Sequence, residues 1–167
     1  RVGVFYGSIS YPRSGIWKNY ISENDIIYAN NNTIGVIAGY LDAAGWGGSG
    51  IKLENIIVKN GTINLTSAGY DVGMIAGFYE SALTTANQSE KEDIESYEIN
   101  RIAASGVIRS SVNSATTNNT PTRIGGLFGK VTAGKKVKNI YSKVELDLSN
   151  NLSVAQKVGG LAGSLNL

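Results

Sequence analysis

The sequence contains no histidine and no cysteine. Without histidine, the chain cannot form a Ser-His-Asp triad, a Cys-His pair or the H-E-x-x-H helix of zinc peptidases. Without cysteine, it has no thiol nucleophile, no disulfide and no thiolate metal site. A cysteine-free chain is also more typical of proteins exported by bacteria than of small eukaryotic secreted domains. We therefore expect a protein that is not an enzyme and that carries no cofactor and no metal.

Charge and proline are scarce as well. Charged residues make up 17% of the chain and the formal net charge is +2, so the composition does not favour nucleic acid as a partner. The lysines at 130–143 are better explained as a solvated face than as a phosphate site. With only 2 prolines and 42% hydrophobic residues, the composition indicates a folded domain rather than a linker or a disordered segment. No signal peptide and no membrane-spanning run is visible, so we expect no membrane insertion.

Glycine, in contrast, is abundant at 21 residues, and many glycines belong to one phrase that recurs five times. The phrase consists of Val or Ile, Gly, two mostly apolar residues, a spacer and a second Gly, as in Ile34–Gly39 and Val158–Gly163. Its first glycines stand at positions 3, 35, 73, 125 and 159, so they are 32, 38, 52 and 34 residues apart. A period of this size is typical of solenoids and repeat arrays, which build surfaces rather than one enclosed reaction centre.

A second segment, hydrophobic-x-Asn-hydrophobic, recurs between the glycine phrases. In the unit at 53–65 the apolar residues change from odd to even positions near Asn55, and back to odd positions at Asn60-Gly61. Because strand side chains alternate between two faces, each change of parity requires a bend or a bulge. Asparagine and glycine tolerate the left-handed backbone angles of such corners. Each unit is therefore predicted to form three short strands joined by corners.

Stacking of these units predicts an all-β fold, a parallel β-solenoid (β-helix) of about five coils with three short strands per coil. Strands of successive coils would pair about 4.8 Å apart, with Val, Ile and Leu filling the interior. We expect residues 1–167 to form one such domain, as a piece of a longer chain. Trp17 is equivalent to Leu53 and is expected in the core. An antiparallel sandwich or barrel is the rival all-β fold, but it does not explain repeats that keep the same strand order.

Two explanations of the repeated glycines stay open. One is a corner that requires a positive φ, and the other is close approach of neighbouring backbone; the strand-forming residues around each glycine favour the corner. The recurring asparagines are expected to bond amide to amide, as an inward or a corner ladder. The predicted structural repeat residues are Gly3, Gly7, Gly35, Gly39, Gly73, Gly77, Gly125, Gly129, Gly159, Gly163, Asn19, Asn55 and Asn139.

The fourth and fifth phrases contain Gly126-Leu127-Phe128-Gly129 and Gly160-Leu161-Ala162-Gly163, which resemble the GLUG motif. This Gly-Leu-apolar-Gly repeat occurs in bacterial surface proteins, in adhesin-like proteins and in the non-catalytic parts of immunoglobulin A peptidases. The first three phrases depart from the motif, because its leading glycine is replaced by Val4, Val36 and Met74. The resemblance implies an extended β-solenoid that is extracellular or attached to a bacterial cell surface. It identifies no ligand, and no residue here matches the metal-binding histidines of the peptidases.

Insertions of unequal length separate the repeating strands, at 40–50, 80–98 and 113–122. Such insertions form surface loops and often carry the binding function of a solenoid. In the first of them Trp46 can present a flat face to a sugar ring, or can fold back over apolar surface. The acidic run at 89–98 either binds calcium or a basic partner, or is a solvated charged loop. The predicted ligand-binding residues are Tyr40, Asp42 and Trp46.

Together these patterns predict a non-enzymatic repeat segment of a bacterial surface or secreted adhesin. It would act as a stalk or spacer and contact a host or cell-surface protein or glycan through its inserted loops, and it would also contact flanking repeats of the same chain. Two alternatives stay open. One is a carbohydrate-active β-helix enzyme, which requires converging carboxylates. The other is a self-assembling structural surface protein, because both ends of a solenoid expose strand edges.

Overall fold

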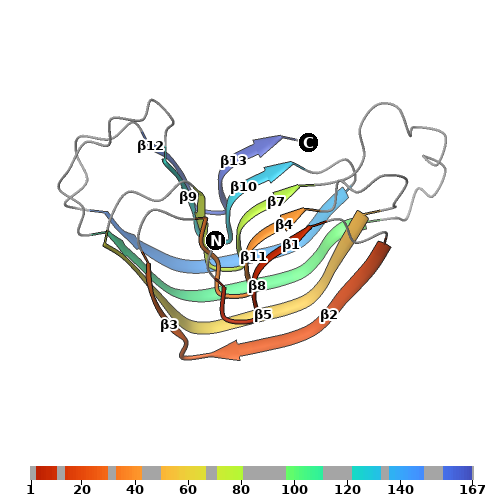
Figure 1. Ribbon diagram of the computed structural model, residues 1–167, viewed down its shortest axis with the longest axis horizontal. Coiled ribbons are helices and arrows are strands. Elements are labelled where there is room, and N and C mark those ends of the chain that lie inside the picture. Colours follow the sequence, from red (N-terminus) through yellow and green to blue (C-terminus); the bar gives the residue numbers. More distant parts are fainter. Residues whose placement is uncertain are drawn as a thin grey trace.

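The computed structural model describes residues 3–10, 14–29, 33–42, 50–66, 71–80, 97–110, 122–132, 136–148 and 156–166. Within these ranges every regular element is a β-strand, and neighbouring strands pair in parallel. The chain passes through the same sheets on successive turns, so its strands stack into coils (Figure 1). The predicted parallel β-solenoid is confirmed.

Long, bent strands form one side of the coils, called the long sheet below. They are β2 (Ser14–Glu23), β5 (Gly50–Leu65), β8 (Tyr97–Ser110) and β11 (Lys136–Asp147), side by side in the order β11-β8-β5-β2. The short strand β3 (Ile26–Ala29) follows β2 and pairs with the second half of β5. In Figure 1 the long sheet is the broad curved layer at the bottom of the view.

Two sheets of short strands complete the coils. The five-stranded sheet contains, in spatial order, β1 (Tyr6–Ser10), β4 (Ala38–Asp42), β7 (Ala76–Glu80), β10 (Phe128–Thr132) and β13 (Ala162–Asn166). The three-stranded sheet contains β6 (Asp71–Gly73), β9 (Thr122–Gly125) and β12 (Gln156–Gly159). Ile34 extends it by a single parallel bridge to Val72.

A full coil therefore has three strands, as predicted, and the five-stranded sheet agrees with the predicted number of coils. The prediction that all three strands are short is wrong for the long sheet, where β5 alone runs for 16 residues. The reason is that an asparagine corner bends a strand without ending it. Glu54 and Ile56, on either side of Asn55, both keep their register partners in β2.

The core consists of columns of similar side chains, one from each coil. Leu53 stands in register with Ile99, and Ile56 with Ile102, and all four side chains are buried. Burial of each such side chain stabilises the fold by roughly 1.5–3 kcal/mol. Trp17 is the register partner of Leu53, as predicted. It is only partly buried against the core.

The corners of the long strands are formed by residues with a left-handed backbone. Within the described ranges six non-glycine residues have a positive φ, between 52° and 62°, and five of them are asparagines. The two corners predicted from the change of parity, at Asn55 and Asn60, are both among them. The complete set is Asn19, Asn24, Asn55, Asn60, Arg101 and Asn139.

The predicted amide ladder is also present, and it lies at the corner of the long strands. Nδ2 of Asn55 donates to Oδ1 of Asn19 over 2.8 Å. In the third coil Arg101 holds the corner, so Nδ2 of Asn139 donates instead to Oδ1 of the neighbouring Asn100, again over 2.8 Å. The ladder therefore joins the coils in pairs.

The favoured explanation of the repeated glycines was wrong. Among the described glycines only Gly106 has a positive φ, and it lies outside the phrase. Most of the phrase glycines stand where two backbones meet. A Cβ on Gly35 would lie 2.5 Å from Cα of Ala76 in the next coil, and a Cβ on Gly77 would lie 2.5 Å from the backbone nitrogen of Ile34. Close approach is therefore what requires glycine at these positions.

Candidate ligand-binding face

The outward face of the five-stranded sheet carries the candidate site. Because side chains alternate along a strand, one residue of each pair points into the core and its neighbour points out. The inward residues are the buried Leu41, Tyr79 and Val131. Their outward neighbours Tyr40, Phe78 and Lys130 are register partners on β4, β7 and β10. These three residues and Glu80 are called the outer strip below.

The side chains of the outer strip are in contact across three coils. The rings of Tyr40 and Phe78 meet edge to face, with 5.0 Å between centroids and 61° between planes. Nζ of Lys130 lies 4.1 Å from the centroid of the Phe78 ring. The Tyr40 hydroxyl donates a hydrogen bond of 2.6 Å to Oε2 of Glu80. Such aromatic and cation–π contacts contribute on the order of 0.5–1.5 kcal/mol each, enough to hold the four side chains in a defined arrangement.

The outer strip combines apolar rings with hydrogen-bonding groups of both charges. Aromatic rings bind the apolar face of a sugar or a hydrophobic side chain, while the carboxylate and the ammonium bind hydroxyl or charged groups around it. All four side chains are half-buried, so they present edges and polar tips rather than whole surfaces. In the described ranges no three acidic side chains gather in a way that could hold a metal ion. The combination of rings and polar groups in the outer strip is suited to contact with a ligand.

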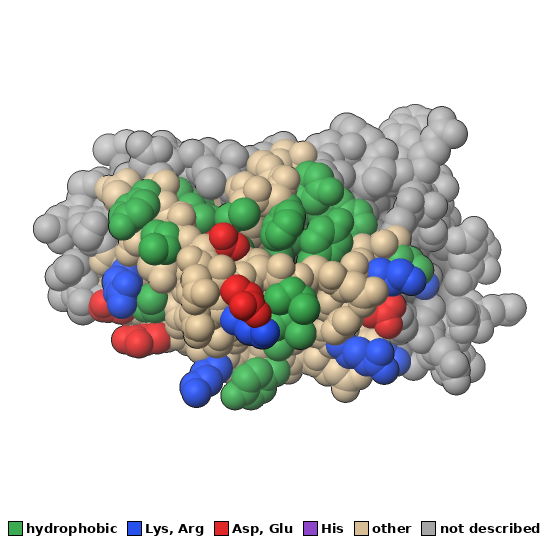
Figure 2. All heavy atoms as spheres, turned by 90° about the horizontal axis from the view of Figure 1, so that it is seen from below, with side chains coloured by type: hydrophobic (Ala, Val, Ile, Leu, Met, Phe, Trp, Pro, Cys, Tyr) green, Lys and Arg blue, Asp and Glu red, His purple; other side chains and the backbone are tan. Residues whose placement is uncertain are grey.

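Charges elsewhere are mixed. On the face seen from below, Lys and Arg side chains alternate with Asp and Glu among several hydrophobic patches, without a stripe of one sign among the coloured residues (Figure 2). One ion pair is buried: Arg123 donates to Asp71 twice, from Nε to Oδ1 and from Nη2 to Oδ2, the latter over 2.9 Å. It joins β6 to β9 and has a structural role, because the Asp71 side chain is only 5% exposed.

The three predicted ligand-binding residues have different places. Tyr40 lies in the outer strip. Asp42 ends β4 in register with Glu80, two residues further along the same strands than the pair of Tyr40 and Phe78. Trp46 lies outside the described residues, as does most of the acidic run at 89–98. That these residues bind a ligand stays a prediction.

The residues predicted from the sequence do not include Phe78, Glu80 or Lys130, although the sequence contains a signal for two of them. Phe78 and Lys130 are each the fifth residue after the first glycine of a phrase, as is Tyr40. Superposing the five phrases on these glycines would have placed the three residues in one column. Glu80 is the equivalent of Asp42, seven residues after that glycine.

The fold and this face define a parallel β-solenoid with a surface suited to binding. No family model matches the chain, and neither the curated proteins nor the solved structures include a match. Within the described ranges, no helix has the length and apolar character needed to cross a membrane.

Proposed function

We propose that this chain is a non-enzymatic segment of a bacterial surface or secreted adhesin. Its coil stack acts as a stalk, and the outer strip, together with the loops that leave its strands, contacts a glycan or protein of a host or of a neighbouring cell. The observation that carries the proposal is the register of the coils. Each coil adds the same rise of about 4.8 Å, so the fold gains length and lateral surface with every repeat.

The position of the outer strip supports the binding role. β4 ends at Asp42 and β7 ends at Glu80, so the inserted segments 43–49 and 81–96 start beside the strip. A solenoid commonly binds where such insertions meet its regular surface. The resemblance of the last two phrases to the GLUG motif supports an extracellular or cell-surface location.

A binding screen with matched variants tests the proposal. The wild-type chain is screened on a glycan array and against extracellular matrix and cell-surface proteins. The ligand found there is then measured with Phe78→Ala and Lys130→Ala, and with Lys157→Ala on β12 as a control for the loss of one exposed lysine. We expect the strip variants to bind about tenfold more weakly, as interface residues of this kind do, and the control to bind like the wild type.

Two results would contradict the proposal. Equal binding by the wild type and by both strip variants would place the ligand away from the outer strip. Release of sugar fragments from a polysaccharide incubated with the chain would show an enzyme, in agreement with the carbohydrate-active alternative.

A further inference from the structure

The outward face of the five-stranded sheet is arranged in rows that run across the coils. Each coil contributes the fifth residue after the first glycine of its phrase, and register pairing joins these residues into one row, called the outer row. Its members are Ser8, Tyr40, Phe78, Lys130 and Ser164. Neighbouring members are about 4.8 Å apart, because this is the spacing of paired strands. The two rings therefore lie within a row that has a hydroxyl group at each end.

A second row lies two residues further along the same strands. Its members are Ser10, Asp42, Glu80, Thr132 and Asn166. The polar groups beside the rings include both acceptors and donors. Because the Tyr40 hydroxyl donates to Oε2 of Glu80, its oxygen still accepts, and Glu80 keeps a second carboxylate oxygen. The Lys130 ammonium supplies three N–H donors.

This chemistry fits a sugar better than a protein. A pyranose ring has C–H groups on its faces and hydroxyls around its edge, and the two rings with their polar neighbours match both. A stable protein interface buries on the order of 800 Å² on each partner, around an apolar centre. The two rows hold only two large apolar side chains, Tyr40 and Phe78, and both are half-buried. The rows therefore lack the apolar area that a protein partner needs.

The charges of the two rows favour a neutral sugar. Lys130 is their only basic residue, whereas Asp42 and Glu80 are acidic. An acidic glycan would meet two like charges for one opposite charge, and the repulsion would oppose binding. A neutral glycan uses the same groups as hydrogen-bond donors and acceptors.

An extended ligand has room along the stack rather than along a strand. β4 ends at Asp42 and β7 ends at Glu80, so each strand offers only two positions of these rows. On the other side the sheet meets the three-stranded sheet, since a Cβ on Gly129 would lie 2.3 Å from the backbone nitrogen of Val72. In Figure 1 the three-stranded sheet rises from this junction at an angle. Across the coils, in contrast, the outer row continues through five strands.

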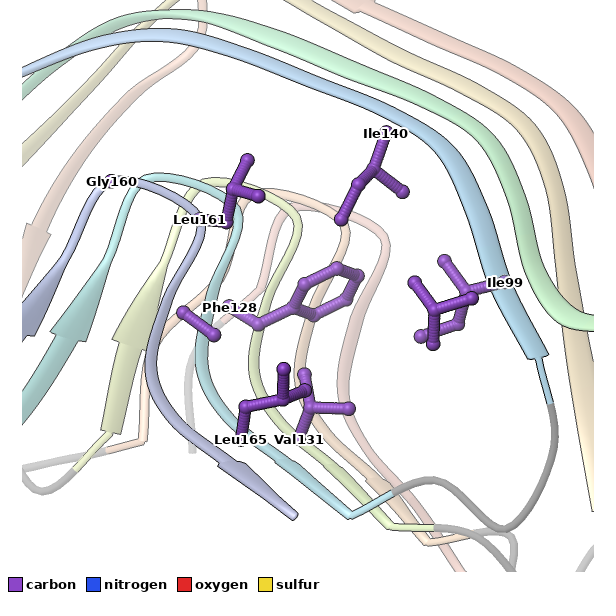
Figure 3. Close-up of a pocket in the computed structure, with 9 residues that line it drawn as sticks. Ile99, Phe128, Val131, Ile140, Gly160, Leu161 and Leu165 are labelled. Carbon is purple, nitrogen blue, oxygen red and sulfur yellow. The ribbon is translucent and has the colours of Figure 1, made fainter. Parts of the chain in front are cut away.

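The apolar cavity beneath this face is unsuited to a sugar. It has a volume of about 390 Å³ and is lined by residues that are apolar or glycine. Figure 3 shows Phe128 and Val131 of β10 and Leu165 of β13 among these residues. Because side chains alternate along a strand, Lys130 and Ser164 point the other way. The polar groups that orient a sugar therefore lie on the outward face.

We propose that the outer strip binds a linear, neutral glycan that lies along the stack, with about one sugar unit for each coil. A pyranose unit of an extended chain is close in length to the spacing of the coils, so successive units meet successive members of the outer row. Inner units stack on Tyr40 and Phe78, while the end units reach Ser8 and Ser164. This inference rests on the proposed function and names the ligand class of the same site.

A length series of oligosaccharides tests the proposal. Isothermal titration calorimetry measures binding of the chain to cello-, chito-, xylo- and manno-oligosaccharides, each from the disaccharide to the hexasaccharide. Oligogalacturonates of the same lengths are the acidic comparison. We expect at least one neutral series to bind, with an affinity that rises about tenfold or more up to the pentasaccharide. The hexasaccharide should gain nothing further, because the outer row has five members.

Variants locate the glycan along the row, and circular dichroism checks that each one folds. Phe78→Ala should weaken binding about tenfold at every length. Ser8→Ala should weaken only the longest oligosaccharides, about threefold, because shorter ones fit on the rings alone. Lys130→Gln keeps a hydrogen-bond donor and should bind the neutral series within about threefold of the wild type. Tyr141→Ala removes an exposed ring from the long sheet and is the control that should bind like the wild type.

The outcomes separate this inference from the proposed function. A protein ligand that is lost in Phe78→Ala, with no oligosaccharide bound, overturns the inference and leaves the proposed function standing. An affinity that is equal at every length overturns the inference, because the ligand would occupy a single position. Preference for the oligogalacturonates, lost in Lys130→Gln, overturns the neutral ligand. Absence of any ligand, protein or glycan, overturns the inference and the proposed binding together.

Discussion

The side-chain amide of Asn55 donates a hydrogen bond to the side-chain oxygen of Asn19, although 36 residues separate the two in the chain. Both residues have a positive φ and stand at the same corner of neighbouring long strands. One residue type thus meets two needs at this corner, because asparagine adopts the left-handed backbone at low cost and its amide binds the next coil. The stability of the stack therefore depends on which residue holds each corner.

Substitutions of Asn55 separate these two contributions. We expect Asn55→Ala to lower the free energy of unfolding by about 1–3 kcal/mol, because alanine loses the hydrogen bond and places a Cβ in the left-handed region. Asn55→Gly should cost less, since glycine keeps the backbone free and loses only the amide. Urea unfolding followed by circular dichroism measures both. Equal losses would show that the backbone angle contributes nothing.

Arg101 is the exception among the corner residues and offers a stabilising change. It has a φ of 56°, and its ion pair with Glu54 is long at 4.0 Å, with the Arg101 side chain largely exposed. We expect Arg101→Asn to raise the free energy of unfolding by about 0.5–1 kcal/mol, because asparagine tolerates this backbone better. Arg109→Asn is the control. Arg109 has no positive φ and forms a similar exposed ion pair, at 3.9 Å from Asp147, so its replacement should not stabilise the protein. The same melting temperature for both variants would contradict the explanation.

Ser142 carries a buried hydroxyl for which the described residues provide no hydrogen-bond partner. The equivalent position in the preceding coil is Ala104. We therefore expect Ser142→Ala to stabilise the protein by about 1 kcal/mol, since an unsatisfied buried hydroxyl is removed. Ser105→Ala is the matched control, and it should destabilise, because Oγ of Ser105 accepts a 3.0 Å bond from the backbone nitrogen of Asn60. Thermal unfolding compares the two, and a loss of stability in Ser142→Ala would refute the assignment.

The buried pair of Asp71 and Arg123 is expected to be the most sensitive charged contact described. Asp71→Asn should lower the free energy of unfolding by about 3–5 kcal/mol, because it leaves the guanidinium largely buried without its counter-charge. Asp147→Asn, in the exposed pair with Arg109, should cost less than about 1 kcal/mol. Chemical denaturation of the two variants gives the comparison. Similar small losses would mean that water reaches the Asp71 site.

The end of the coil stack formed by β1 and β2 should respond to alkaline pH through Tyr20. A hydrogen bond with the side chain of Tyr6, and then burial, raise the pKa of Tyr20 above its ordinary value of 10.0. The folded protein thus favours the neutral phenol, so this contribution to stability is intact below pH 10.0 and is lost as the pH rises through the raised pKa. Tyr6→Phe should lower the pKa of Tyr20. The difference in tyrosinate absorbance between the wild type and Tyr20→Phe gives the pKa of Tyr20 with Tyr6 present. The difference between Tyr6→Phe and Tyr6→Phe/Tyr20→Phe gives it without Tyr6. The same pKa in both cases would contradict the role of the hydrogen bond.

Features that depend on one residue type could be predicted from the sequence. The corners at Asn55 and Asn60 follow from a change of parity together with residues that accept a positive φ, and the solenoid follows from the repetition of that pattern. The role of the glycines could not be predicted in the same way. Gly35 is required because of Ala76, a residue of the next coil, and local sequence shows nothing about such a contact.

The outer strip was only partly predictable for a related reason. Tyr40, Phe78 and Lys130 form a column only when the register between coils is known, and insertions of unequal length hide that register along the chain. The first glycine of each phrase preserves it, because it fixes where one coil meets the next. Trp46 is predicted from its residue type and from its place in a glycine-rich insertion, and it lies outside the described residues.

The proposed function depends on the register of the coils, which engineered cysteines test most directly because the chain has none of its own. Ile57 and Ala103 are register partners on β5 and β8, so their Cα atoms should lie about 4.8 Å apart, within disulfide range. We predict that Ile57→Cys/Ala103→Cys oxidises to an intramolecular disulfide. Ile57→Cys/Ser105→Cys, offset by two residues and about 8 Å apart, should stay reduced. A disulfide in the offset pair and none in the matched pair would contradict the stacked coils.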